Sequence, residues 1–178
     1  MAKKNDSPLL QSDVDRILYA KKTVDLTGVK WGKKPPPGRS PMWLQTSIIP
    51  YDGVMPIAGL RLVLQWRPPD GPDDVQKIQM VALYYSRRVF GVDSYPYDRH
   101  TNRVHVSHPD FEKSILGAHY HLYFESAVPY EIGLAIPQKI APDDFLGYWQ
   151  FFCSKINITC KGELPLPTQE DSGQIPLL

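Results

Sequence analysis

The sequence lacks the features that mark several large classes of protein. No segment approaches the roughly 20 consecutive apolar residues of a membrane-spanning helix, and the residues after Asp6 do not form the apolar run of a secretory signal. Neither sign of charge is in excess, because 20 Lys and Arg residues nearly cancel 19 Asp and Glu residues and leave a net charge of +1. A protein that coats nucleic acid is usually more basic than this. These absences predict a cytoplasmic protein with no membrane partner, and they are compatible with a local basic patch.

Cysteine is also scarce. The two cysteines, Cys153 and Cys160, are not spaced as a Cys-x-x-Cys site. A disulfide is not expected in a cytosolic protein. Cys153 falls on the apolar face of a predicted helix, so we interpret it as a buried packing residue.

Residues 1–161 are predicted to form one α+β domain. A chain of 178 residues is long enough to bury a sizeable core. Inside this domain, residues 32–41 are basic and rich in proline, which indicates a solvated connector, with an anion-contacting arm as the alternative. Residues 162–178 are rich in Pro, Gln and Gly and have no periodicity, so we expect a flexible C-terminal tail.

Alternation of apolar and polar residues predicts several strands. Residues 60–66 alternate in this way, and residues 77–85 are apolar on both sides, which is typical of a central strand. We expect further strands at residues 87–93, near 104–106, and at 118–125 and 131–136, the last two as a hairpin. The predicted fold is therefore an antiparallel sheet of about five to six strands, covered by helices.

Two helices are predicted to flank these strands. A short N-terminal helix over residues 8–20 carries a capping box of Ser12 and Asp15. Pro142 and Asp143 mark the start of an amphipathic C-terminal helix that packs against the sheet. The first helix has an apolar stripe of Val14, Ile17 and Leu18, and the second has an apolar face of Phe145, Leu146, Trp149, Phe152, Cys153 and Ile156.

The strand predicted over residues 118–125 has the clearest chemical signal. His119, His121, Tyr123 and Glu125 share one face of it, because side chains alternate along a strand. Residues two apart on a strand are about 6.5–7 Å apart at Cα, so the two imidazoles can share a metal ion or a phosphate. Glu125 lies roughly 13 Å from His121 along the strand. It therefore fits a positioning role better than a ligand to the same ion.

Three interpretations of this face stay open. In the first, the two histidines bind a metal together with His100 or His105. In the second, they perform acid–base chemistry on a phosphodiester without a metal, because imidazole titrates near pH 6.5. A neighbouring arginine would then stabilise the developing charge, with Arg87, Arg88, Arg99 and Arg103 as candidates. In the third, the histidines lie on an open sheet face or pack beneath the loop over residues 94–114 without a chemical role.

The order of these polar residues resembles an uncharacterised family of small bacterial and phage proteins. That family carries an Arg-x-Asp segment, a His-x-Asn-Pro-Asp-Gly loop, a His-x-His-x-Tyr-x-Glu strand and a terminal helix. The chain is also remotely similar to the TumE-like toxins of toxin–antitoxin systems. It departs from the pattern in its longer Arg-to-Asp gap and in Arg103, which follows Asn102 directly. The resemblance covers about residues 80–158 and rests on Arg88-x4-Asp93, His100-Thr101-Asn102 and His119-x-His121-x-Tyr123-x-Glu125.

The resemblance implies a toxin-like ribonuclease or another nucleic-acid-processing protein, with RNA or an antitoxin as partner. His100, His119 and His121 would surround the scissile phosphate, with Tyr123 and Glu125 completing the catalytic set. Asp93 and Asn102 would bind the substrate, and Arg88 and Arg103 join this substrate-binding set as the neighbouring cations that the sequence itself offers. No cofactor is predicted, and metal binding by the histidines is left open.

The alternative is a non-catalytic protein of a phage or mobile element that inhibits or bridges a host protein. The near-neutral charge suits such an anti-defence role, because protein interfaces are less charged than nucleic-acid interfaces. Aromatic side chains are the usual anchors of these interfaces. The sequence offers Trp31, Trp43, Tyr95 and Tyr97 as exposed candidates.

Overall fold

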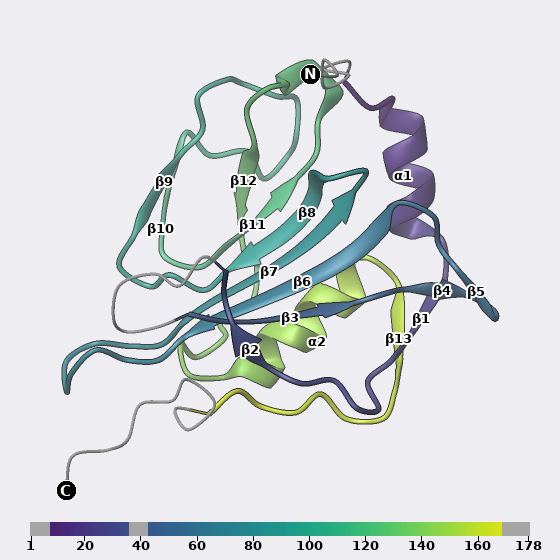
Figure 1. The fold of residues 1–178 in the computed structure, drawn as a ribbon. Coiled ribbons are helices and arrows are strands. Elements are labelled where there is room, and N and C mark those ends of the chain that lie inside the picture. Colours follow the sequence, from purple (N-terminus) through teal and green to yellow (C-terminus); the bar gives the residue numbers. More distant parts are fainter. Residues whose placement is uncertain (1–7, 36–42, 169–178) are drawn as a thin grey trace, which may run out of the picture.

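The computed structural model describes residues 8–35 and 43–168, and its main element is a seven-stranded antiparallel sheet (Figure 1). The strands are β2 (Gly32–Lys33), β3 (Leu44–Ile48), β6 (Leu60–Arg67), β7 (Lys77–Tyr84), β8 (Arg87–Asp93), β11 (His119–Leu122) and β12 (Ile132–Ala135). They lie in the order β12–β11–β8–β7–β6–β3–β2. The predicted α+β class with an antiparallel sheet is confirmed, although this sheet has seven strands rather than five or six.

Two smaller sheets and two helices complete the described chain (Figure 1). A four-stranded sheet contains β1 (Lys22–Asp25), β4 (Tyr51–Asp52), β5 (Met55–Pro56) and β13 (Ile158–Lys161), in the order β13–β1–β4–β5, with β1 and β13 parallel. A two-stranded hairpin pairs β9 (Arg99–Thr101) with β10 (Ser114–Leu116). The helices are α1 (Gln11–Tyr19) and α2 (Phe145–Lys155), and residues Glu125–Ala127 form one turn of 3-10 helix.

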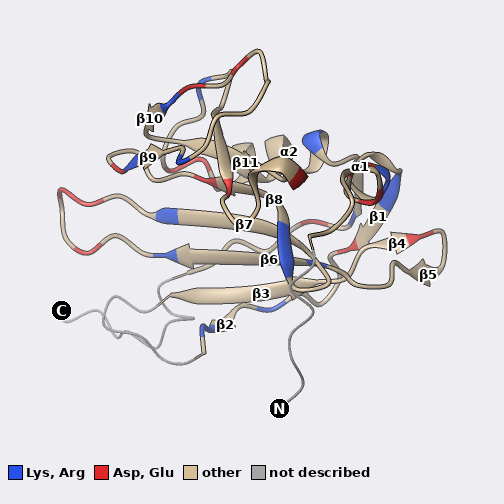
Figure 2. Ribbon diagram, turned by 90° about the horizontal axis from the view of Figure 1, so that it is seen from above, with Lys and Arg blue, Asp and Glu red and all other residues tan. Residues whose placement is uncertain are grey.

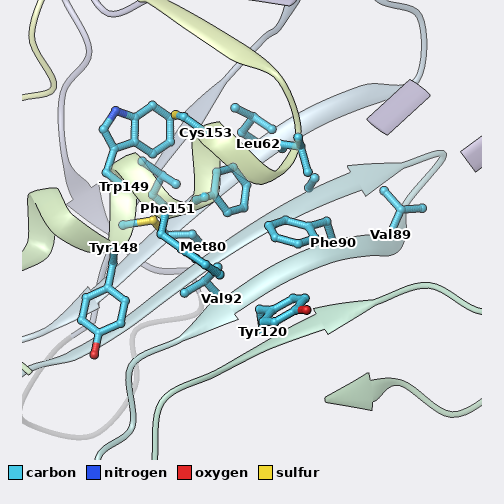
Figure 3. Close-up of a cluster of buried hydrophobic side chains, with 14 of the residues drawn as sticks. Leu62, Met80, Val89, Phe90, Val92, Tyr120, Tyr148, Trp149, Phe151 and Cys153 are labelled. Atoms are coloured by element: carbon cyan, nitrogen blue, oxygen red, sulfur yellow. The ribbon is translucent and has the colours of Figure 1, made fainter. Parts of the chain in front are cut away.

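The hydrophobic core lies between the large sheet and α2. β6 and β7 direct alternate side chains into it, as their sequence pattern predicts, and β7 is central because it lies between β6 and β8. Helix α2 places large aromatic side chains against Phe90, Val92 and Tyr120 (Figure 3). Burial of each such side chain contributes about 1.5–3 kcal/mol. The buried residues of α2 are Phe145, Tyr148, Trp149, Phe151, Phe152 and Cys153.

Both helices begin differently from the sequence prediction. Asp144, not Asp143, caps α2 by accepting a hydrogen bond from the backbone N–H of Gly147 at 2.8 Å. The predicted Ser12–Asp15 capping box does not form, and the first backbone N–H of α1 donates instead to the distant Glu125 carboxylate. Leu146 is 43% exposed, against prediction, because α2 turns Tyr148 and Phe151 inward in its place.

Two of the predicted strands also need correction. The strand expected near residues 104–106 is absent, and the hairpin β9–β10 lies on either side of that segment. The strand expected over residues 118–125 ends at Leu122, where the chain leaves the ladder with β12 and turns into the 3-10 helix. The second difference decides which predicted residues reach the candidate site.

The predicted connector and tail are partly described. Gly32 and Lys33 of the connector form β2, and residues 36–41 lie outside the described residues. Residues 162–168 of the predicted tail pack against the body of the protein, since Leu164 is buried and Pro165 accepts a hydrogen bond from the Trp31 indole at 2.8 Å. Residues 169–178 also lie outside the described residues.

A buried lysine joins the ends of the two helices. Lys22 is 1% exposed, and its ammonium donates hydrogen bonds to the backbone carbonyls of Leu18 and Ala20 at 2.7 Å and to that of Ile156. Burial lowers its pKa to about 8.

None of the helices within residues 8–35 and 43–168 is both long and apolar enough to cross a membrane.

Candidate functional site

The candidate site is a cluster of three histidines on the sheet face opposite the core. In β11, His119 lies beside Asp93 of β8, and His121 lies between Gly91 of β8 and Gly133 of β12. Because Tyr120 points into the core, its two neighbours in β11 point to the other face. The hairpin β9–β10 stands beside β11 and β12 (Figure 1) and adds His100.

The three imidazole rings form a nearly equilateral triangle. Their centroids are 4.8 Å apart for His100 and His119, 4.9 Å for His100 and His121, and 4.8 Å for His119 and His121. One ring nitrogen of each lies within 4.8 Å of one ring nitrogen of the other two. His119 and His121 are each only 4% exposed, and His100 is partly buried.

Two strand glycines make room for this cluster. A Cβ on Gly133 would lie 2.5 Å from Cδ2 of His100, so the ring can lie over β12 only because this position has no side chain. A Cβ on Gly91 would overlap the Arg88 guanidinium in the same way. Glycine inside a strand is typical of such close approaches.

Each imidazole has one ring nitrogen held by an oxygen that can only accept. His119 Nδ1 lies 2.8 Å from the Gly117 carbonyl, His121 Nε2 lies 3.0 Å from Asp93 Oδ2, and His100 Nε2 lies 3.1 Å from Asn102 Oδ1. The hydrogen therefore belongs on the bonded nitrogen, and the other nitrogen of the neutral ring keeps its lone pair. The three neighbouring rings therefore each offer one nitrogen of the kind that can bind a metal ion.

Asn102 fixes the position of His100. The asparagine is fully buried, and its amide nitrogen donates to the carbonyls of Glu112 at 2.7 Å and Gly133 at 2.8 Å. Its amide oxygen accepts from the Gly133 N–H at 2.8 Å. These three backbone contacts fix which amide atom is the oxygen, and hence that His100 Nε2 must donate to it.

Asp93 provides the negative charge of the site. Asp93 is 5% exposed, and its carboxylate contacts Arg88 Nη2 at 3.2 Å, His121 Nε2 at 3.0 Å and His119 Nε2 at 3.7 Å. Burial by itself raises the pKa of Asp93, but the His121 hydrogen bond and Arg88 outweigh it and hold the pKa below its usual range. Arg88 also contacts Glu131 at 3.2 Å, which links the site to the sheet edge.

The two buried histidines are neutral at physiological pH. Burial lowers the pKa of His121 to about 4 and also lowers that of His119. Neutral imidazoles can bind a metal or accept a proton. Near pH 7 neither ring is an imidazolium that could donate a proton to a leaving group. His121 Nδ1 has no hydrogen-bond partner within the described ranges and lies 3.6 Å from Glu131 Oε2, beside a cavity of about 170 Å³.

Two predicted catalytic residues make their polar contacts elsewhere. The Tyr123 hydroxyl donates to the Leu9 carbonyl at 2.6 Å, and the Glu125 carboxylate accepts from the Gln11 N–H at 2.7 Å. Both groups hold the start of α1, because β11 ends at Leu122 and no longer alternates beyond it. The structure brings together the predicted residues His100, His119, His121, Arg88, Asp93 and Asn102.

Other candidates lie outside the cluster. His105 is exposed and packs against Phe111, which leaves His100 as the third histidine. Arg103 is exposed, with its guanidinium 5.7 Å from the Tyr130 ring centroid. Of the four aromatic residues expected to be exposed, only Tyr97 is, since the rings of Trp31, Trp43 and Tyr95 are partly buried in edge contacts.

Sequence reasoning missed the residues that shape the site without entering its chemistry. Gly91 and Gly133 interrupt two apolar strands, and that interruption was the available signal. Glu131 and the Gly117 carbonyl had no signal, because only the folded sheet brings them to the histidines. No family model, curated protein or solved structure matches this chain.

Proposed function

We propose that His100, His119 and His121 bind a divalent transition metal, with zinc as the first candidate. The observation that carries the proposal is the triangle of rings with centroids 4.8–4.9 Å apart. Imidazoles that share one tetrahedral ion have centroids roughly 5 Å apart, because each ligand nitrogen lies about 2 Å from the ion. The spacing of the three rings therefore fits a shared ion.

The outer contacts of the three rings support the same proposal. In a metal-binding histidine one ring nitrogen binds the ion, and the N–H of the other ring nitrogen usually donates to a carboxylate, a backbone carbonyl or another fixed acceptor. Here the acceptors are Asp93, the Gly117 carbonyl and the Asn102 amide oxygen. The lowered pKa values of His119 and His121 keep both rings unprotonated, the form that binds metal.

Zinc titration of metal-free protein tests this proposal. Wild-type protein is expected to bind one equivalent, and His119→Ala or His121→Ala to lower the affinity at least about a hundredfold, since loss of an outer partner alone costs about 10–100-fold. His105→Ala is the matched control, because His105 is exposed and outside the triangle. Less than about a tenth of an equivalent bound by untagged, folded wild-type protein would refute metal binding.

We further propose that this centre hydrolyses phosphodiesters in RNA. Three histidine ligands leave coordination positions open, and a metal so bound can lower the pKa of a water to about 7 and polarise a phosphoryl oxygen. Arg99 and Arg103 flank His100 in the chain and are exposed, and neither forms an ion pair with a described acidic residue. Acidic and basic residues are interspersed over the ribbon (Figure 2), so contacts to RNA phosphates would depend on individual exposed arginines such as these two.

Incubation of labelled RNA with zinc-loaded protein tests the reaction. Wild-type protein is expected to cleave RNA, and a chelator or the His119→Ala/His121→Ala double variant to abolish cleavage. Arg103→Ala is expected to raise KM more than it lowers kcat, because the exposed guanidinium would act in binding. Cleavage that survives both the chelator and the double variant would point to a contaminating nuclease.

A result in which zinc binds and RNA stays intact would favour a binding role for the protein. One observation supports that candidate: Ile49 and Tyr85 are 50% and 62% exposed and line the same surface cleft, beside the β4–β5 turn with Val54 at 89% exposed. Apolar side chains gathered at one surface are typical of protein interfaces. Ile49→Glu would then abolish capture of a stoichiometric protein partner.

A further inference from the structure

Outside the histidine cluster, the two cysteines form a pair of reactive side chains that lie close together. Cys153 lies in the last turns of α2, Cys160 lies in β13, and their sulfur atoms are 3.9 Å apart. Cys153 is 7% exposed, whereas Cys160 is exposed. One thiol is therefore accessible to a reagent, and the second is protected and within reach of the first.

We propose that Cys160 and Cys153 form a redox-active dithiol that closes to an intramolecular disulfide by exchange with a low-molecular-weight disulfide. A disulfide bond is about 2.05 Å long, so the sulfur atoms must approach by about 2 Å. Strand β13 can make this movement, because it is an edge strand that pairs only with β1. Cys153 is buried in the core as predicted, and the exchange would be an additional role for it.

The surroundings assign different roles to the two sulfurs. The hydrogen bond between the two sulfur atoms lowers the pKa of Cys160 to about 7, and the Trp149 indole contributes in the same direction. The same hydrogen bond, followed by burial, raises the pKa of Cys153. Cys160 is therefore the nucleophile, since the thiolate is the reactive form and a thiol with a pKa near ambient pH attacks fastest.

The exchange takes place in two balanced steps. The Cys160 thiolate attacks one sulfur of the small disulfide, a new sulfur–sulfur bond forms, and the displaced thiolate leaves and takes up a proton from water. Cys153 then loses its proton to solvent and attacks Cys160, which releases the second small thiolate. The first step removes the Cys160 thiolate, and with it the largest cause of the raised pKa of Cys153. Both protein thiols are oxidised, and the small disulfide is reduced to two thiols.

The surface next to Cys160 can receive such a reagent. A cleft of about 900 Å³ is lined by Cys160 together with Trp149, Leu146 and Leu164. A small organic disulfide fits this volume. Because Leu164 and Pro165 belong to the segment that follows β13, closure of the disulfide would also restrain the chain where it packs against Trp31.

Reaction of the reduced full chain with oxidised glutathione, followed by alkylation and intact-mass measurement, tests the proposal. Wild-type protein is expected to lose two hydrogens and to take up neither alkyl nor glutathionyl groups. Cys153→Ser is expected to stop at the mixed disulfide on Cys160, and Cys160→Ser to stay reduced. Without glutathione, Cys160 should be alkylated at least about tenfold faster than Cys153, because it is exposed and more ionised.

Three results would overturn the proposal. They are wild-type protein that keeps two free thiols, wild-type protein that accumulates the mixed disulfide, and Cys160→Ser protein that reacts as fast as Cys153→Ser. Circular dichroism of each variant confirms that it is folded, and the wild-type result decides the question by itself if a serine variant fails to fold. The histidine cluster takes no part, so His119→Ala is expected to form the disulfide at the wild-type rate.

Discussion

Asn102→Ala is expected to lower the free energy of unfolding by about 4 kcal/mol. The variant removes all three contacts by which the side chain pairs with the backbone of Glu112 and Gly133. Each buried backbone group left without a partner costs about 1–3 kcal/mol. Gly133 lies in the edge strand β12, where the Asn102 amide takes the place of a missing strand. Urea unfolding, followed by circular dichroism, measures the loss.

Two further variants sharpen this experiment. Asn102→Asp keeps an acceptor for the Gly133 N–H but places a carboxylate against two carbonyls, so it should destabilise the fold at least as much as alanine does. Ser114→Ala is the control from the same hairpin, since it removes one exposed hydrogen bond from Arg99 and should cost less than about 1 kcal/mol. Equal stability of Asn102→Ala and wild type would mean that water replaces the asparagine amide.

The second large expected effect is a loss of folding stability at acidic pH. His121 alone is expected to remove about 3 kcal/mol of stability between pH 6.5 and pH 4, because burial lowers its pKa from 6.5 to about 4 and each unit corresponds to about 1.4 kcal/mol. The pKa of His119 is also lowered by burial, so this residue adds to the loss of stability in acid. In this window the unfolded chain binds protons that the folded chain does not, so stability is complete above pH 6.5 and falls as the solution is acidified.

Urea unfolding of chelator-treated protein at several pH values between 7 and 4.5 checks the effect. His121→Gln should reduce the slope of stability against pH by about one proton, and the exposed His105→Gln should leave it unchanged. Asp93 keeps its charge throughout this range, because the His121 hydrogen bond and Arg88 hold its pKa low against the effect of burial. A wild-type slope equal to that of His121→Gln would show that His121 titrates normally in the folded protein.

Local patterns in the sequence correctly predicted the parts of the fold that depend on them. The alternation of Leu60, Leu62 and Leu64 and the apolar face of α2 follow from the periods of strand and helix, and both face the core. The His-x-His pattern placed His119 and His121 on one face for the same reason. What failed was the extension of that face to Tyr123 and Glu125, because a strand alternates only while its ladder continues, and this ladder ends at Leu122.

The sequence by itself therefore determined the class of fold, the strand that carries two histidines and the helix that covers the core, since each depends on residues close together in the chain. Only the tertiary structure decided that the third histidine is His100 rather than His105, which follows from the long-range contacts of Asn102 with Gly133 and from the space over Gly133. It also decided that Asp93 orients His121 and that Glu125 caps α1. These contacts join residues separated by 28 to 114 positions, and no local period or propensity specifies such pairs.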